Sequence, residues 1–328
     1  SSDVCSSDLH RILNNPDVQE NIKKSFPKSD IKRRNSGYAL DALIEMQPFN
    51  PAGKPFNLSA LFAGSEGTLA VVHAMKVHLL DLPEPHVNLL CIHCESIQDA
   101  LQANLIVLSF EPTASELVDD FILSFTIQHP NFEALRDFIE GNPAAILMVE
   151  FRGQHAMEVN QKIQNCIQAL QKAKIGYAFP VLDAENMYKG WDIRKAGLGL
   201  IRNLVADEQA VNLIEDCAVS PQDLPAYVGD VQSLLARKGV KAAYYAHAGA
   251  GELHIEPFLN LKNEEGKRLF REILTETVQI LKKYQGSLSG EHGDGRLRGE
   301  FIQEVMGSQM LQLFEEIKSL FDPHNILN

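Results

Sequence analysis

The chain has 328 residues, of which 45% are apolar, and its 30 Lys and Arg side chains against 43 Asp and Glu give a formal charge of −13 at pH 7. This length suffices for one large or two ordinary domains and excludes general disorder. The deficit of basic residues excludes nucleic acid and anionic membrane surfaces as expected partners, and no apolar run reaches the ~20 residues of a membrane-spanning helix. The five cysteines are few and odd in number, which fits a reducing compartment, so we expect a cytoplasmic protein.

The N-terminal part of the chain is predicted to be mostly helix and loop. Residues 1–9 contain Ser-Ser-Asp twice and almost nothing apolar, so we expect a non-native or disordered leader there. Apolar residues at helical spacing predict a short helix over His10–Lys24. Ile31–Tyr38 combines basic residues with Asn, Ser and Gly and predicts a polar loop, and GSEGTLAVV at Gly64–Val72 predicts a tight turn that leads into a strand.

The middle of the chain alternates strands with helices. Its segments predict, in order, strand, helix, helix, strand and helix over Val87–Cys94, Ile97–Leu108, Ala114–Phe125, Ala144–Phe151 and Ala156–Lys172. A sheet with helices segregated on one face satisfies this order, so we predict an α+β fold. Cys91 and Cys94 form a CxxC motif inside the first strand. We interpret them as buried strand cysteines, and a metal or redox pair is the alternative.

The C-terminal part is predicted to contain a hairpin and a long helix. Val240–His247 and Leu253–Phe258 have the pattern of two strands, joined through a glycine-rich reversal. Apolar residues on one side predict an amphipathic helix over Glu264–Tyr284, followed by a polar glycine loop. Two further helical stretches, Phe301–Met306 and Gln309–Phe321, close the chain.

His247, His254 and Glu291 are the first candidate group for chemistry. The two histidines are seven residues apart, an odd spacing that would put them on opposite faces of one straight strand. Gly249 and Gly251 change this expectation, because a chain reversal between the histidines brings both rings to one point. Two imidazoles and a carboxylate suit a divalent cation that keeps open positions for substrate. Hydrogen-bonded structural histidines are the alternative.

His292 and Arg194 are further candidates. His292 follows Glu291 in a glycine-rich loop, and adjacent side chains point in different directions, so Glu291 can bind a metal while His292 acts as general base. A solvated loop is the alternative. The guanidinium of Arg194 can hold a substrate carboxylate through two parallel hydrogen bonds, and a surface salt bridge with a nearby Asp is the alternative.

Four motifs occur in one order along the chain: FAGSEGTLA at Phe62–Ala70, HAGAGELH at His247–His254, SGEHGDG at Ser289–Gly295 and DPHNILN at Asp322–Asn328. Together they resemble the C-terminal half of the FAD-linked oxidases of the vanillyl-alcohol oxidase type. They are more similar to the D-lactate and D-2-hydroxyglutarate dehydrogenase branch, and within it to long bacterial proteins with a downstream iron–sulfur domain.

The resemblance implies a split flavin-binding domain into which a ferredoxin-like antiparallel sheet, covered by helices, is inserted as a substrate cap. We therefore expect residues 10–84 to be the C-terminal part of the FAD-binding domain, 85–285 the substrate or cap domain, and 286–328 an active-site loop with closing helices that return to the flavin site. The family's N-terminal lobe has no counterpart in this sequence, and no cysteine-rich cluster motif is present. We expect a fragment whose partners are that missing FAD lobe and a downstream iron–sulfur domain.

The resemblance also implies roles for individual residues. His247, His254 and Glu291 resemble ligands of a divalent metal (zinc, iron or manganese), His292 resembles the base, and Arg194 resembles the anchor of the substrate carboxylate. The residues expected to lie against FAD are Asn35, Gly37, Tyr38, Gly64, Ser65, Glu66, Gly67, Thr68 and Asn325. Related sequences generally carry Lys where this chain has Gln209, so no substrate contact is assigned there.

The implied reaction is oxidation of a D-2-hydroxy acid, of the D-lactate or D-2-hydroxyglutarate type, to the 2-oxo acid, with FAD as hydride acceptor, a divalent metal and a histidine base. The isolated fragment is expected to be inactive. The alternatives are a non-catalytic cap module that requires a separate FAD lobe, a glycolate-oxidase-type subunit, and a structural ferredoxin-like binding domain without flavin or metal.

Overall fold

The computed structural model describes residues 2–127, 129–201 and 206–328. It divides into two compact units, which we call unit 1 (Ser1–Leu79 and Leu281–Asn328) and unit 2 (Leu80–Ile280). The expected domain limits, after residues 84 and 285, lie five residues further along the chain than the two boundaries between these units. The roles assigned to the domains remain predictions. Among the described residues, no helix has both the length and the apolar content required to cross a membrane.

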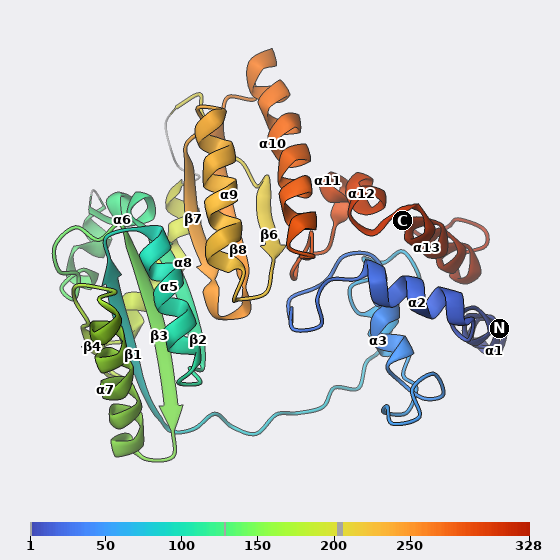
Figure 1. The fold of residues 1–328 in the computed structure, drawn as a ribbon, viewed down its shortest axis with the longest axis horizontal. Coiled ribbons are helices and arrows are strands. Elements are labelled where there is room, and N and C mark those ends of the chain that lie inside the picture. Colours follow the sequence, from blue (N-terminus) through green and yellow to red (C-terminus); the bar gives the residue numbers. More distant parts are fainter. Residues whose placement is uncertain (1, 128, 202–205) are drawn as a thin grey trace. The chain divides into compact units, whose positions relative to one another are not determined.

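Unit 2 holds the sheet, whose first half is a βαβ unit with a third strand inserted (Figure 1). Strand β3 lies between β1 and β2 and is antiparallel to both, and β4 pairs with the other side of β1. The elements are β1 (His86–Cys94), α5 (Ile97–Leu108), β2 (Ala114–Asp119), β3 (Ala145–Gly153), α7 (Ala156–Ala173) and β4 (Val181–Leu182). This arrangement is the predicted ferredoxin-like one.

The second half of the sheet has a similar order of elements, strand, helix, strand, strand and helix. Strand β8 lies antiparallel between β6 and β7, with the short β5 also on β8, and β7 pairs with β2 to join the two halves. The elements are β5 (Gln209–Ala210), β6 (Ile214–Ala218), α9 (Leu224–Arg237), β7 (Ala242–His247), the 3-10 turn η2 (Ala248–Ala250), β8 (Glu252–Leu259) and α10 (Glu264–Lys283). The predicted α+β class with an antiparallel sheet is confirmed.

Helices cover both faces of the first half, so the expectation of helices on one face is wrong. Leu89, Cys91 and Met148 pack against α6 (Asp120–Ile127) and α8 (Tyr188–Ile201). The alternate positions of β1 are also fully buried, and α5 and α7 pack on β1 and β3; Figure 1 shows both helices in front of these strands. The reason lies in the strands themselves: β1 from Leu89 to Ile92 and β3 from Ala145 to Val149 are apolar at consecutive positions, so both faces need cover.

Unit 1 is a helical cluster around one apolar core, to which Leu9, Leu43, Leu61 and Phe314 contribute. Its helices are α1 (Ser2–Leu13), α2 (Pro16–Ser25), α3 (Leu40–Ile44), α4 (Ser59–Phe62), α11 (Gly295–Arg298), α12 (Ile302–Met306) and α13 (Ser308–Phe321). The core joins segments from both ends of the chain, and this brings the N-terminal loop and turn next to the glycine loop that follows α10.

Four expectations about elements differ from the structure. Residues 2–9 belong to helix α1, and Leu9 is fully buried in the core. The expected leader ends at residue 9 and so separates Leu9 from Ile12 and Leu13, with which it forms one apolar stripe of the helix. The helix expected over His10–Lys24 is two helices, since Asn15 caps the second and Pro16 starts it.

The other two differences concern strands. The helix expected over Ala114–Phe125 is strand β2 followed by α6. The turn at Gly64 leads into residues 70–84, which have no assigned helix or strand, so the expected strand does not form there. The Cys91 and Cys94 prediction is confirmed, because both are free, buried cysteines within β1.

Candidate functional site

The β7–β8 hairpin brings His247 and His254 together. His254 pairs across the strands with Tyr245, and His247 lies two residues beyond Tyr245 on the same face. The two imidazole rings are 5.2 Å apart, centroid to centroid, and nearly perpendicular. Imidazoles that bind one ion at about 2.1 Å have ring centres about 5 Å apart, so this spacing fits two ligands of a single metal.

Glycines and two polar side chains hold the hairpin in place. Gly251 has φ +74°, and a Cβ there would lie 2.1 Å from the Val219 carbonyl oxygen, so no other residue fits the turn without a shift. The Asn104 amide donates to the Ala248 carbonyl (2.9 Å) and accepts from the Ser115 hydroxyl (2.8 Å). The loop between the two histidines is therefore tied to α5 and β2.

Arg194 on α8 reaches the same face of the sheet, where it meets a carboxylate that no motif in the sequence indicates. The Arg194 Nε and Nη2 atoms donate to Glu116 Oε2 at 3.2 and 2.9 Å. His247 Nδ1 lies 2.9 Å from both carboxylate oxygens of Glu116. The alternative for Arg194, a salt bridge, is thus present, but its partner is Glu116 in β2 and both side chains are about 85% buried.

The surroundings of His254 are aromatic and acidic. Its ring stacks on Tyr245 with centroids 4.8 Å apart, and the Arg194 guanidinium lies 5.1 Å from the Tyr245 ring centre. Glu252, His254 and Glu256 alternate along β8, so they face the same side, and all three are almost completely buried. Burial raises the pKa of the Tyr245 phenol, which keeps it neutral over the physiological range.

In unit 1, the loop at Asn35–Tyr38 is hydrogen-bonded to the glycine loop after α10. The Asn35 side-chain amide donates to the Glu291 carbonyl (2.8 Å), and the Gly37 N–H donates to Asp294 Oδ2 (2.7 Å). Burial raises the pKa of Asp294, while the Gly37 N–H lowers it. Two motifs more than 250 residues apart thus form one structure.

The turn at Gly64–Thr68 lies beside them. A Cβ on Gly64 (φ +80°) would lie 2.1 Å from Asn35 Oδ1, so glycine allows the turn and the loop to touch. The Glu66 carboxylate accepts from the Gly295 N–H at 3.1 Å, and the hydroxyls of Tyr38 and Thr68 are 2.7 Å apart. The turn, the loop and the glycine loop therefore surround a common space.

That space is a pocket of about 760 Å³. Of the residues expected to contact FAD, its lining includes Gly37, Tyr38, Gly64, Ser65, Glu66 and Thr68. Asn35 and Gly67 support the turn without lining the pocket, and the exposed Asn325 does not line it either. Asn328 lines it instead and donates to the Glu66 carbonyl at 3.4 Å.

Glu291 and His292 belong to unit 1, whereas His247 and His254 belong to unit 2. The Glu291 carboxylate forms an ion pair with Arg33 and lies 3.5 Å from His292 Nε2. The His292 side chain is 44% exposed. Their expected roles as metal ligand and base stay predictions.

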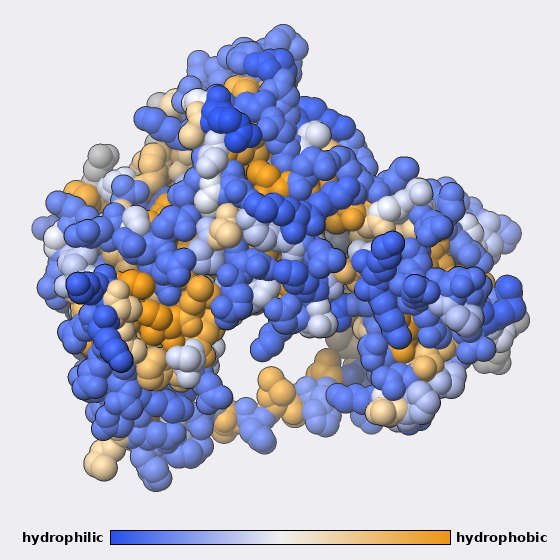
Figure 2. All heavy atoms as spheres, in the orientation of Figure 1, coloured by the Kyte–Doolittle hydropathy of each residue, from blue (hydrophilic) through white to orange (hydrophobic). Residues whose placement is uncertain are grey.

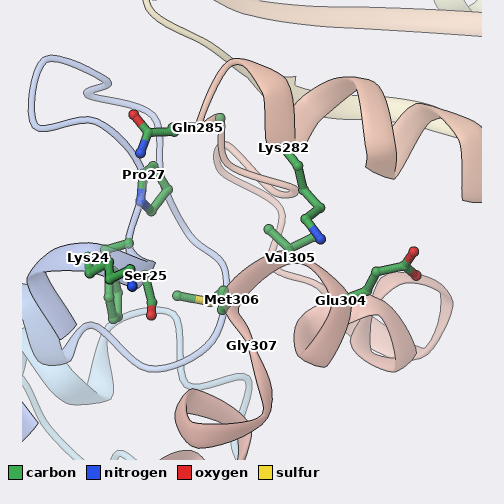
Figure 3. A pocket seen from close by; sticks show the side chains of 11 residues that line it. Lys24, Ser25, Pro27, Lys282, Gln285, Glu304, Val305, Met306 and Gly307 are labelled. Carbon is green, nitrogen blue, oxygen red and sulfur yellow. The ribbon is translucent and has the colours of Figure 1, made fainter. Parts of the chain in front are cut away.

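A second hollow in unit 1, of about 320 Å³, is shown in Figure 3. Lys24 of α2, Lys282 of α10, and Glu304 and Met306 of α12 are part of its lining. It contains none of the predicted site residues and no cluster of groups suited to catalysis, so we assign no chemistry to it.

The fold and the two groups of residues define a class of protein: an antiparallel α+β unit with a histidine–arginine cluster, together with a helical unit that holds a glycine-lined pocket. Residues 83–328 match the family model described as FAD linked oxidases, C-terminal domain, and the chain belongs to this family. The resemblance stated from the motifs is confirmed.

Similar proteins agree with this membership. A D-2-hydroxyglutarate dehydrogenase of Pseudomonas putida is 32% identical over 317 residues, which cover 94% of this chain and 30% of the relative. A D-lactate dehydrogenase of Anaerostipes hadrus is 24% identical and covers 83% of this chain and 58% of the relative. The chain thus spans about 30% of the length of the D-2-hydroxyglutarate dehydrogenases it matches.

Solved structures share the fold at low sequence identity. A p-cresol methylhydroxylase with substrate bound has a TM-score of 0.53 at 12% identity, and the match covers 74% of this chain and 52% of that one. A 4-ethylphenol oxidase from Gulosibacter chungangensis gives 0.51 at 11% identity, with the same coverage.

Proposed function

We propose that this chain is the substrate-binding and flavin-contacting part of an FAD-dependent dehydrogenase that oxidises a D-2-hydroxy acid, of the D-lactate or D-2-hydroxyglutarate type, to the 2-oxo acid. The observation that carries this proposal is the cluster on one face of β2, β7 and β8, where His247, His254 and Arg194 lie together. Two imidazoles and a guanidinium match the hydroxyl and carboxylate that every 2-hydroxy acid presents on adjacent carbons. The similarity to D-2-hydroxyglutarate and D-lactate dehydrogenases supports this substrate class.

A divalent metal fits the histidine pair by donor chemistry and by ring spacing. His247 and His254 would hold it, and Glu291 is the third ligand that the resemblance to the family implies. When bound, the ion lowers the pKa of the substrate hydroxyl. Arg194 anchors the carboxylate of the same substrate.

The flavin ring fits the pocket of unit 1, because about 760 Å³ is within the range of cofactor sites and the lining combines backbone groups with hydroxyls. Tyr38, Ser65 and Thr68 would hold it, and the glycines of the turn let its edge approach the backbone. When bound, FAD supplies the acceptor for the hydride that leaves the substrate α-carbon. Cys91, Cys94 and Cys166 are buried and form no disulfide, which fits the cytoplasm as the compartment.

His292 completes the reaction as general base. Oxidation of the alcohol removes two electrons and two hydrogens: the hydride leaves the α-carbon, the hydroxyl proton passes to the His292 imidazole, and the C–O bond becomes a carbonyl. Positioned bases of this kind contribute about 10²- to 10⁴-fold to rate.

Two substitutions separate the metal ligand from the base. In a flavin-loaded enzyme that contains this chain, His254→Ala should lose bound metal and turnover together, whereas His292→Ala should keep its metal and lose turnover by about 10²- to 10⁴-fold. Elemental analysis and steady-state kinetics measure the two effects. Full metal occupancy in His254→Ala, or turnover within a few-fold of wild type in His292→Ala, would contradict the respective assignment. His155→Ala, at an exposed position before α7, is the matched control.

The alternative function is a non-catalytic cap module that requires a separate FAD lobe. Absorbance of the purified chain near 450 nm distinguishes the two: stoichiometric flavin supports a self-sufficient enzyme, and a colourless preparation supports the module. The similarity to a glycolate oxidase subunit of Bacillus subtilis, 25% identical, makes glycolate one substrate to include in the assay.

A further inference from the structure

Glu116 occupies a central position in the histidine–arginine cluster. Both oxygens of its carboxylate lie 2.9 Å from His247 Nδ1, and one of them also accepts from two nitrogens of Arg194. The side chains of Glu116 and Arg194 are 16% and 15% exposed. One carboxylate therefore contacts both the expected metal ligand and the expected substrate anchor.

The sheet places Glu116 there. Strands β2 and β7 pair antiparallel, and Leu117 lies opposite Ala246 at the end of the paired stretch. The next residue on each strand is Glu116 on β2 and His247 on β7, so this register places the two residues side by side. At the start of β2, Ala114 and Glu116 are partly buried whereas Ser115 is buried, and β7 ends at His247. The contact thus follows from strand register.

The chemistry of this contact fixes the form of the imidazole. An ionised carboxylate has no hydrogen to donate, so the His247 Nδ1 must carry the proton and donate it to Glu116. The neutral ring then has its lone pair on Nε2, the only nitrogen left for a metal. Carboxylates that accept from a metal-binding histidine orient its ring and raise the basicity of the ligating nitrogen.

The same carboxylate also fixes Arg194. Because Nε and Nη2 both donate to Glu116 Oε2, the plane of the guanidinium is set, and the Tyr245 ring 5.1 Å away supports it from one side. An arginine held along one edge in this way presents its remaining N–H groups in a defined direction.

We propose that Glu116 is a positioning residue that sets the Nδ1–H tautomer of His247 and the plane of Arg194, and thereby aligns the metal ligand and the carboxylate anchor. This inference rests on the proposed function for the roles of His247 and Arg194. The contacts that define Glu116 lie entirely within unit 2.

The first test examines the tautomer in the metal-free chain. Long-range ¹⁵N–¹H spectra of histidine-labelled protein at about pH 8.5, where imidazoles are ordinarily neutral, report which ring nitrogen carries the proton, and loss of signals in His247→Gln assigns the residue. We expect His247 with its proton on Nδ1 in the wild type and a mixture of tautomers in Glu116→Gln, because the amide can also donate. A wild-type His247 protonated on Nε2 would overturn the proposal, and this measurement does not depend on how well the variant folds.

The second test measures affinity for Zn²⁺, by competition with a chelating dye, for the same 328-residue chain. Glu116→Gln should bind Zn²⁺ about 10- to 100-fold more weakly than wild type, as loss of such an outer carboxylate does in known metal sites. The control is Glu150→Gln, which removes a carboxylate on β3 that is 11% exposed, against 16% for Glu116, and that accepts from Arg152 at 2.7 Å. Equal loss in both variants, or no loss in Glu116→Gln, would overturn the proposal.

The two tests separate this inference from the proposed function. If wild type binds no Zn²⁺, the metal role of the histidines fails and the inference fails with it. If wild type binds Zn²⁺ and Glu116→Gln binds it as tightly, the proposed function survives and the positioning role alone is wrong.

Discussion

Asp119 is a buried carboxylate at the junction of β2 and α6. It is 1% exposed, and its two oxygens accept from the Ile122 N–H (2.9 Å) and the Tyr244 N–H (2.7 Å). Burial raises its pKa from 3.8 to about 7, although the two backbone donors lower it. The folded protein therefore holds a proton on Asp119 at pH values where the unfolded chain has released it.

This proton links stability to pH. Because the folded pKa is raised, the contribution is complete below about pH 4 and is lost as pH rises through 7. We expect the free energy of unfolding of wild type, relative to Asp119→Asn, to fall by about 3 kcal/mol between pH 5 and pH 8. Urea unfolding at the two pH values measures this difference.

The control is Asp192→Asn, because Asp192 is an exposed carboxylate on α8 and is not among the groups that shift the pKa of Asp119. Its stability relative to wild type should not change with pH in this window. The same pH dependence in wild type and Asp119→Asn would show that Asp119 is ionised in the folded protein.

At the scale of elements, the turn at Gly64 shows why only glycine suits this position of the loop. Alanine at position 64 would strain a backbone with φ +80° and would also place its Cβ 2.1 Å from Asn35 Oδ1. A Cβ on Gly239, at φ +67°, would have no other atom within 4 Å, so this position tests the backbone strain alone.

We expect Gly239→Ala to lose about 1 kcal/mol of unfolding free energy, the cost of a left-handed alanine. Gly64→Ala should lose at least 1 kcal/mol more and should weaken flavin binding to an enzyme that contains this chain, because the pocket wall moves. Thermal unfolding and flavin titration measure both. Equal destabilisation by the two variants, with flavin affinity unchanged, would refute the role of the turn as a pocket wall.

The segment at Ala114–Phe125 shows where sequence patterns fail for an element. Its apolar residues fit one helix, yet the chain forms β2 up to Asp119 and α6 from Asp120. The choice is made by contacts far away in sequence: β2 pairs with β3 and β7, and Asp119 binds the backbone of Tyr244 while it caps the helix. No pattern within twelve residues contains this information.

That error also explains why Glu116 was missed. In a helix, Glu116 has no relation to His247, and in a strand it lies beside it. The contact between His247 and His254, by contrast, could be predicted, because the glycines between them indicate a chain reversal within one short motif. Local motifs were therefore predictable, and the contact between motifs was not.

At the scale of the whole chain, the segment from Val71 to Leu82 is a large exposed apolar feature. Leu79, Leu80 and Leu82 are 83–94% exposed, and the segment forms no strand or helix among the described residues. Figure 2 shows orange atoms along it. Extended apolar chain with free backbone groups is a template for association.

We expect the purified chain to self-associate with rising concentration, and the double variant Leu79→Lys, Leu80→Lys to remain monomeric over the same range. Analytical ultracentrifugation measures both. Met157→Lys, at an apolar position that is 83% exposed outside the segment, is the control and should behave as wild type. A wild-type chain that stays monomeric, or an equal effect of Met157→Lys, would show that this segment does not drive association.

The pairing of β2 with β7 has a consequence for the order of events during folding. Glu116 and His247 are 131 residues apart, and each belongs to a different half of the sheet. Closing so long a loop comes after the local hairpin has formed. For the metal site proposed above, we therefore expect binding only after the sheet has formed, whereas in a zinc finger the ion itself organises the chain.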